Sequence, residues 1–202
     1  MGKIAVYGGT FNPIHNGHIH LAKQFAQLLG IDRVILIPTR VPPHKQASAL
    51  ASPQDRLTMC GLASPGGIFE VSNIEIRRKG PSYTADTLLE LKRQNPGSEL
   101  YLITGEDMFV TIQNWYRAQT IYSLATLCAA PRSTEGLQPL LDHARVLEQS
   151  GARTIINNID YLPISSTMVR SAIQNGESIS EFVPAAVADY IVKNNLYLEC
   201  GK

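Results

Sequence analysis

The chain has 202 residues, of which 44% are hydrophobic, and this suits one globular domain with a substantial core. Its 18 lysines and arginines nearly balance its 17 aspartates and glutamates, so bulk electrostatic attraction to nucleic acid or to a membrane surface is not supported. The three cysteines, Cys60, Cys128 and Cys200, are far apart, which argues against a disulfide framework or a zinc knuckle.

The opening residues, MGKIAVYGG, form a short strand pattern that stops at two glycines and do not resemble a signal peptide. No apolar run in the sequence is long enough to span a bilayer. We therefore expect a cytoplasmic protein that binds neither membranes nor nucleic acid.

The first elements form a strand–helix–strand unit. Residues 3–7 read as a buried strand, residues 17–29 carry apolar side chains at helical spacing, and RVILIP at 33–38 reads as a second buried strand. A helix between two such strands predicts parallel pairing through a right-handed crossover.

Strand and helix patterns alternate along the rest of the chain. The stretch 39–54 is rich in proline and serine and reads as a surface loop. We expect further strands at 67–76, 99–105, 123–131 and 153–159, and helices at 55–63, 82–95, 136–149, 166–174 and 184–194. The alternation predicts an α/β protein with a Rossmann-like, doubly wound, mainly parallel sheet and helices on both faces. We expect residues 1–202 to form a single domain, with a small helical part at about 163–202.

The loop after the first strand reads YGGTFNPIHNGHIH and has the composition of an anion site. Gly8 and Gly9 allow a tight turn and a close approach of the backbone to a ligand. His15 and His18 are three residues apart at a helix entrance, which would put both rings on one face, beside N–H groups that attract anions. A zinc site built on the two histidines lacks an obvious third ligand, and the dinucleotide fingerprint G-x-G-x-x-G is absent.

The segment GGTFNPIHNGH resembles the G-x-F-x-P-x-H-x-G-H signature of the histidine-motif nucleotidyltransferases. Its long form, which begins with Gly-Gly-Thr-Phe, is similar to that of the nicotinate-nucleotide adenylyltransferases. The resemblance implies that a nucleotidyltransferase domain binds ATP through this segment. From the spacing of the two histidines at the helix entrance, we expect both to be catalytic, with His18 stabilising the transition state and His15 helping to hold the phosphates. The implied ATP-binding residues here are Gly8, Gly9, Thr10, Phe11, His15 and His18.

A second anion site is predicted where PISSTMVRSAI opens the helix at 166–174. Ser165 or Ser166 can cap that helix, Thr167 adds a hydroxyl, and Arg170 can reach an anion with a planar guanidinium. The segment resembles the I-S-S-T-x-x-R motif of the same superfamily, which implies binding of the ATP triphosphate. The resemblance adds Arg170 to the catalytic residues and the two serines and Thr167 to the ATP-binding residues.

The implied reaction explains these residue types. A substrate phosphate attacks the α-phosphorus of ATP and pyrophosphate leaves, so neither a general base nor a protein nucleophile is needed. Catalysis then depends on in-line positioning and on neutralising developing charge, with Mg²⁺ on the phosphate oxygens. We expect Mg²⁺ to arrive with ATP and no metal site built from protein ligands alone.

Several segments resemble the acceptor-binding parts of the family. VPPHK places His44 and Lys45 on the predicted loop, and SYTADTL implies that Tyr83 and Thr84 meet the pyridine carboxylate. Thr84 could cap the following helix, and we expect Asp86 near the start of that helix to be mostly structural.

The segment ITGEDMF resembles a G-x-D motif in which Gly105 and Asp107 meet adenosine. Trp115, the only tryptophan, matches a residue that stacks on the pyridine ring, and Tyr116 is a weaker candidate. Arg132 stands in Pro-Arg-Ser where the family has Arg-Pro-Gly, and we expect it to bind phosphate.

Asn12 stands where the family often has aspartate. Thr10 and Asn12 complete the implied acceptor-binding residues.

The sequence thus predicts transfer of the adenylyl group of ATP to nicotinate mononucleotide, giving deamido-NAD and pyrophosphate in NAD biosynthesis. Use of nicotinamide mononucleotide, or of both acceptors, is the nearest alternative, and a non-catalytic nucleotide-binding protein is a remote one. The sequence leaves open whether the chain forms a homo-oligomer.

Overall fold

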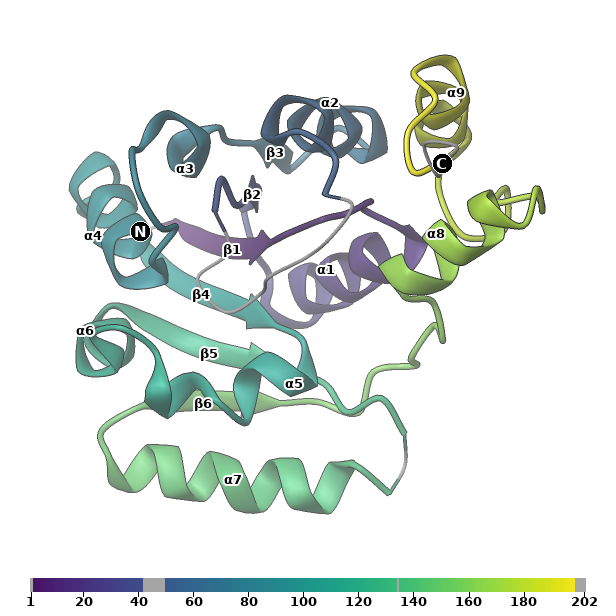
Figure 1. The fold of residues 1–202 in the computed structure, drawn as a ribbon. Coiled ribbons are helices and arrows are strands. Elements are labelled where there is room, and N and C mark those ends of the chain that lie inside the picture. Colours follow the sequence, from purple (N-terminus) through teal and green to yellow (C-terminus); the bar gives the residue numbers. More distant parts are fainter. Residues whose placement is uncertain (1, 42–49, 134, 199–202) are drawn as a thin grey trace.

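The computed structural model describes residues 2–41, 50–133 and 135–198 (Figure 1). Its strands are β1 (Lys3–Gly9), β2 (Arg33–Pro38), β3 (Phe69–Val71), β4 (Glu99–Thr104), β5 (Ala125–Ala129) and β6 (Arg153–Ile156). Its helices are α1 (Asn16–Leu29), α2 (Pro53–Ala63), α3 (Ile74–Arg77), α4 (Thr84–Gln94), α5 (Glu106–Phe109), the 3₁₀ helix η1 (Ile112–Asn114), α6 (Ala118–Leu124), α7 (Leu137–Gln149), α8 (Ser166–Gln174) and α9 (Ala185–Lys193). No helix within these described ranges is both long and apolar enough to cross a membrane.

The strands form one sheet in the order β3-β2-β1-β4-β5-β6, and every neighbouring pair is parallel. The chain first builds outward from β1 to β3, then returns to the middle of the sheet and builds outward again from β4 to β6. This confirms the predicted Rossmann-like, doubly wound fold. The order reverses between β1 and β4, and ligands of such folds bind beside the carboxyl ends of the strands at this switch point.

Helices cover both faces of the sheet, which explains why its central strands are almost entirely apolar (Figure 1). Side chains alternate across β1, so that Ala5 and Tyr7 belong to a core shared with α1, α2, α8 and α9. Ile4 and Val6 point the other way, into a second core with α4, α6 and α7. The two cores fix β1 between them and therefore fix the loop that leaves its end.

Helix α1 begins one residue before the predicted start and ends where the sequence predicts. Its last turn is closed by Gly30, whose φ of 61° is left-handed and whose backbone N–H donates to the carbonyl of Ala26. Glycine adopts this conformation without the steric cost that a side chain brings, so it stops the helix cleanly.

The predicted strand at 67–76 is wrong beyond Val71. Only Phe69–Val71 pairs with β2, and the chain then turns into α3, helped by the Ser72 hydroxyl, which accepts from the N–H of Ile74. Ile74 and Glu75 are both buried although they are adjacent, which a strand with one buried face does not allow. Short apolar runs fit both periods, and here the tertiary context chose the helix.

The sequence analysis also missed α5, η1 and α6, because their short segments carry no sustained apolar period. The predicted strand at 123–131 is correct only for Ala125–Ala129, since Ser123 and Leu124 end α6. The strand predicted at 153–159 ends at Ile156. The two C-terminal helices are confirmed as α8 and α9.

Candidate active site

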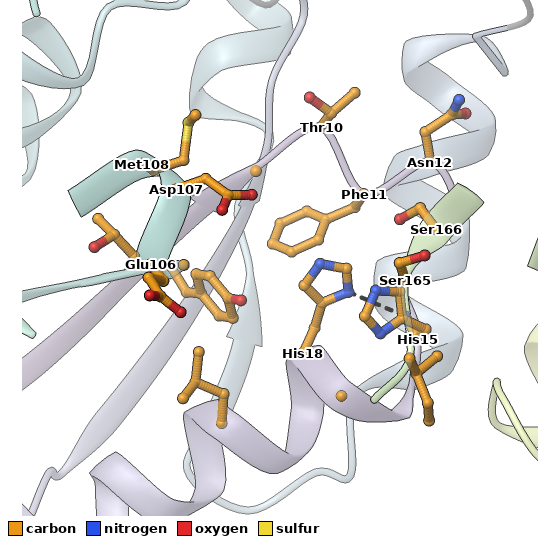
Figure 2. A pocket seen from close by; sticks show the side chains of 18 of the residues that line it. Thr10, Phe11, Asn12, His15, His18, Glu106, Asp107, Met108, Ser165 and Ser166 are labelled. Atoms are coloured by element: carbon orange, nitrogen blue, oxygen red, sulfur yellow. Dashed lines mark hydrogen bonds between the residues drawn. The ribbon is translucent and has the colours of Figure 1, made fainter. Parts of the chain in front are cut away.

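A cavity of about 590 Å³ lies at the predicted switch point, where the segments after β1, β4 and β5 meet the start of α1 and α8. Figure 2 shows its wall, with side chains from the loop after β1, from the start of α1, from α5 and from the start of α8. The cavity therefore gathers segments that are far apart in the sequence.

The predicted site residues within the described ranges all line this cavity. They are Gly8, Gly9, Thr10, Phe11, Asn12, His15, His18, Tyr83, Thr84, Gly105, Asp107, Trp115, Arg132, Ser165, Ser166, Thr167 and Arg170. His44 and Lys45 lie outside the described residues. The structure brings the named residues together, and their individual roles in binding stay predictions.

The loop after β1 turns sharply at Phe11, whose φ of 46° is left-handed. This conformation is rare for a bulky residue. The Phe11 ring lies so close to Gly9 that a Cβ atom there would come within 3.0 Å of two ring atoms. A side chain at position 9 would therefore crowd the Phe11 ring, which glycine avoids.

The two histidines meet at the start of α1, but not as the helical spacing predicted. His15 is not helical: it is the extended residue before α1, with φ −143° and ψ 170°. Its backbone N–H donates to Nδ1 of His18 at 3.2 Å, and the two rings stack with centroids 3.6 Å apart (Figure 2). The pair is thus assembled by capping geometry and ring stacking.

These contacts set the tautomer of His18 and the charge of His15. Because Nδ1 of His18 accepts a hydrogen bond, the neutral ring carries its proton on Nε2. His15 is buried, and burial, followed by the positive charge of Arg132, lowers its pKa to about 4. His15 is therefore neutral at physiological pH.

The second predicted anion site is present at the start of α8. The Ser165 hydroxyl accepts from the N–H of Met168 at 3.1 Å, which confirms the predicted cap. The Ser166 hydroxyl donates to the carbonyl of Pro13 at 2.8 Å. Arg170 donates to the carbonyl of Asn12 at 2.8 Å and to the Thr167 hydroxyl at 3.3 Å. The start of α8 is therefore bonded directly to the loop after β1.

Asn12 lies at the centre of a buried hydrogen-bond network. Its side-chain oxygen accepts from the N–H of Ala51 at 3.0 Å and from the hydroxyl of Tyr197 at 2.9 Å. Beside it, the guanidinium of Arg56, 1% exposed, donates to the carbonyl of Thr10 at 2.7 Å. The side-chain oxygen of Asn12, a predicted substrate-binding residue, thus already accepts two hydrogen bonds within the protein.

Arg132 reaches the cavity from the segment after β5. Its guanidinium pairs with the Asp107 carboxylate at 2.7 Å, and its backbone N–H donates to the Glu106 carboxylate at 2.8 Å. The shifted register of the Pro-Arg-Ser segment therefore does not move this arginine away from the site. Both partners in the ion pair are about half exposed, so the pair is weak enough for a ligand to exchange with it.

The other end of the cavity is aromatic. Tyr83 and Tyr116 stack with centroids 4.4 Å apart, and Trp115 lines the same cavity. The prediction that Thr84 caps α4 is wrong, because Tyr83 is the residue before the helix and makes no side-chain capping bond. Asp86 forms an ion pair with Arg117 at 3.7 Å, in keeping with a structural role.

Glu75 is a cavity residue that the sequence analysis missed, because its segment was assigned to a strand. It is 3% exposed, and its Oε1 accepts from the Thr87 hydroxyl at 2.8 Å. Its Oε2 is buried and makes no hydrogen bond of normal geometry with the described residues, although the Ser82 hydroxyl is near enough to act on the carboxyl group. Burial raises the pKa of this group by more than Thr87, Ser82 and Arg78 lower it. Its signal in the sequence was a lone acidic residue between two isoleucines.

His20 also lines the cavity, although it is not among the predicted site residues. Its Nε2 lies 2.7 Å from the carbonyl of Asp160, in the segment that joins β6 to α8. This segment wraps around the start of α1 and extends the cavity further than the sequence indicated. Within the described ranges, no three histidine, cysteine, aspartate or glutamate side chains gather in a way that could hold a metal ion.

The chain matches the Cytidylyltransferase-like family over residues 6–172. A protein of Dehalococcoides mccartyi named "Probable nicotinate-nucleotide adenylyltransferase" is 42% identical, covering 96% of this chain and 97% of its own length. A protein of Carboxydothermus hydrogenoformans with the same name is 39% identical, covering 96% and 98%.

Among solved structures, the nicotinic acid mononucleotide adenylyltransferase of Plasmodium falciparum complexed with NaAD has the same fold. Its TM-score is 0.79 at 21% identity, with 98% of each chain covered. The chain therefore belongs to the Cytidylyltransferase-like family and, within it, to the nicotinate-nucleotide adenylyltransferases.

Proposed function

We propose that the chain catalyses transfer of the adenylyl group of ATP to nicotinate mononucleotide, as the names of its relatives indicate. The phosphate oxygen of the mononucleotide attacks the α-phosphorus of ATP and forms a new P–O bond. The bond from the α-phosphorus to the bridging oxygen breaks, and pyrophosphate leaves. The product is nicotinate adenine dinucleotide.

The observation that carries this proposal is that one cavity has two chemically different ends. At one end, two helix N-termini, His18 and Arg170 offer N–H donors to phosphate groups. At the other, Tyr83, Trp115 and Tyr116 offer flat apolar faces for an aromatic ring. A mononucleotide with a pyridine ring has the matching shape, with the phosphate at one end and the ring at the other.

Each phosphate-side group has a chemical role in this reaction. His18, with its proton on Nε2, donates to the oxygens on which negative charge develops. Arg170 donates one N–H to the carbonyl of Asn12 and one to the hydroxyl of Thr167, and its guanidinium has further N–H groups that can bind the triphosphate. His15 stacks on His18, and because His15 is neutral it places no second positive charge beside that ring.

We propose Mg²⁺ as the cofactor, bound with ATP. The carboxylates of Glu106 and Asp107 lie in the cavity wall, but both already contact Arg132. This fits an ion held mainly by nucleotide phosphates and water, which is the usual environment of Mg²⁺ in nucleotide sites. When bound, the ion supplies neutralisation of the triphosphate charge.

One observation favours a second acceptor. The buried carboxyl group of Glu75 lines the cavity beside Ser82 and has lone pairs that can accept a further hydrogen bond, and the carboxamide of nicotinamide mononucleotide has N–H donors where nicotinate has none. Nicotinate instead needs donors, which the backbone N–H groups at the start of α4 can supply. Both acceptors therefore have a structural rationale.

The test is release of pyrophosphate with ATP-Mg²⁺ and each mononucleotide, compared as kcat/KM. We expect a preference for nicotinate mononucleotide, in line with the names of the relatives. In the Glu75→Gln variant, which keeps the side-chain shape, residual use of the nicotinamide form should change most if Glu75 contacts the carboxamide. The absence of release with either acceptor would refute the proposed reaction.

A further inference from the structure

We propose that Phe11 is a positioning residue: its ring fixes the imidazole of His18 in the orientation that the reaction needs. The inference rests on the proposed function, since it gives a role to a residue that acts through His18. The family resemblance implied ATP binding by Phe11, but its side chain is only 2% exposed, so any contact with ATP is left to its backbone.

The Phe11 ring lies against His18 in an edge-to-face arrangement, with centroids 5.1 Å apart and planes at 85° (Figure 2). Tyr7 contacts both rings, at 5.5 Å from Phe11 and 5.9 Å from His18. Together with the stacked ring of His15, these contacts surround the His18 imidazole with three other rings. Such packing restricts rotation of the imidazole about its side-chain bonds.

The backbone of Phe11 is held in an unfavourable conformation that delivers the ring to this place. The flanking carbonyls are both anchored by buried or half-buried arginines: Thr10 by Arg56 at 2.7 Å and Asn12 by Arg170 at 2.8 Å. The left-handed φ of 46° persists because the structure on both sides fixes it. Strain that the surroundings hold in place is typical of functional sites.

The N–H of His15 donates to Nδ1 of His18 at 3.2 Å and sets part of the orientation of the imidazole. That bond fixes the position of Nδ1 but allows the ring to tilt about the line that joins the two residues. The Phe11 ring opposes this tilt, so that the Nε2–H group keeps a constant direction. A small displacement of a catalytic donor is costly, because a shift of about 1 Å can lower a rate by about 100-fold.

The experiment is a double-mutant cycle with Phe11→Leu and His18→Ala, assayed with ATP-Mg²⁺ and nicotinate mononucleotide. Phe11→Leu keeps an apolar side chain but removes the flat ring. We expect its kcat to fall by about 10-fold or more, while the KM values of both substrates change by less than about 3-fold. In the His18→Ala background, Phe11→Leu should lower kcat by less than about 2-fold, because the residue through which it acts is gone.

Phe25→Leu is the matched control. Phe25 is fully buried in the same core as Phe11, about two turns beyond His18 on α1, so its replacement removes the same kind of ring away from the start of the helix. Both leucine variants should lower the melting temperature, but Phe25→Leu should leave kcat within about 2-fold of the parent. Equal loss of kcat in the two variants would overturn the proposal, since general loosening of the core would explain it.

Two further outcomes would also overturn it. One is that Phe11→Leu lowers kcat by the same factor in the His18→Ala background as in the parent. The other is that His18→Ala does not lower kcat at all.

A measurement that needs no turnover separates this inference from the reaction itself, namely the ¹⁵N spectrum of the imidazoles. The parent and Phe25→Leu should show one tautomer of His18, with the proton on Nε2, and Phe11→Leu should show averaging of both tautomers. If the ¹⁵N spectrum of Phe11→Leu matches that of the parent, the inference is wrong, even if the parent proves inactive with nicotinate mononucleotide.

Discussion

The two ends of the cavity are built in different ways. At the phosphate end, three side chains from two distant helices, α2 and α8, donate to carbonyls of one loop: Arg56 to Thr10, Arg170 to Asn12 and Ser166 to Pro13. Each of these bonds joins segments that the fold alone brings together. The shape of the phosphate end therefore depends on the whole sheet and its flanking helices.

The aromatic end is built mostly from one local stretch. Thr87 donates to Glu75 and accepts from Arg78, and all three residues lie within one turn-and-helix segment. Trp115 and Tyr116 come from another part of the described chain, and Tyr116 stacks on Tyr83. The contrast indicates that changes at the phosphate end will affect stability and rate together, whereas changes at the aromatic end will affect binding of the acceptor alone.

Replacing Arg56 with methionine should give the largest effect on stability. The buried guanidinium donates to the carbonyls of Thr10, Ala51 and Arg40, and methionine leaves all three without that donor. At about 1 kcal/mol for each lost bond, the free energy of unfolding should fall by about 3 kcal/mol. Urea denaturation of both proteins measures this change.

Arg33→Met is the control for the loss of an arginine. Arg33 is half exposed and donates to the Glu70 carboxylate at 2.7 Å and to the Asn95 side chain at 3.0 Å. Because water can replace these partners at the surface, its loss should cost only about 1 kcal/mol. If Arg56→Met is no more destabilising than Arg33→Met, the phosphate end does not depend on its distant anchors, and the contrast between the two ends fails.

The buried His15 predicts an acid-sensitive phosphate end. Its pKa is about 4 in the folded protein and near its ordinary value of 6.5 when unfolded, so the unfolded chain binds the proton first as the pH falls. Stability should therefore decrease between about pH 6.5 and pH 4, by on the order of 3 kcal/mol, and show no further loss from this group at lower pH.

The His15→Asn variant isolates this contribution. Asparagine is a good residue before a helix and does not titrate, so other groups cancel when the two proteins are compared. The difference in unfolding free energy between parent and variant should shift against the parent as the pH is lowered from 7 to 4. Parallel curves across this range would show that the folded protein lets His15 take up a proton freely.

The contrast between the two ends also explains what could be predicted from the sequence. The opening loop and the start of α8 carry specific motifs, and the elements around them follow clear apolar periods, so their place at the switch point was predictable. The contacts between residues within the motifs were less predictable. The sequence shows His15 and His18 three residues apart, but not that one precedes the helix and bonds to the other through its backbone.

Residues outside the motifs were missed for two physical reasons. Glu75 lies in a short apolar run whose period fits a strand and a helix equally well, and only the packing of α3 under the cavity decides. Arg56 and Tyr197 act through hydrogen bonds to backbone or to Asn12 across long sequence separations. A single sequence carries no signal for such pairs.

Trp115→Ala tests the aromatic end. Loss of a flat apolar face should raise the KM of nicotinate mononucleotide by about 10-fold, with the KM of ATP changed by less than about 2-fold. Tyr116→Ala is the control, because Tyr116 is half exposed and stacks on Tyr83 at the rim. It should have a smaller effect on the same KM. Equal increases in the two KM values for Trp115→Ala would instead assign the residue to folding.

Ser165 and Ser166 offer the finest test of the contrast, because adjacent hydroxyls at the start of α8 make different kinds of bond. Ser165 caps its own helix through the N–H of Met168, whereas Ser166 reaches the carbonyl of Pro13 in the distant loop. Ser165→Ala should lower the free energy of unfolding by about 1 kcal/mol, as loss of a cap does. Ser166→Ala should lower the free energy of unfolding by a similar amount, since one hydrogen bond is lost, but it should also loosen the loop that carries Phe11.

Hydrogen exchange of the amides in that loop distinguishes the two serine variants. Faster exchange in Ser166→Ala alone supports a phosphate end that is held by distant residues. Equal exchange in both variants means that α8 acts only through its own stability.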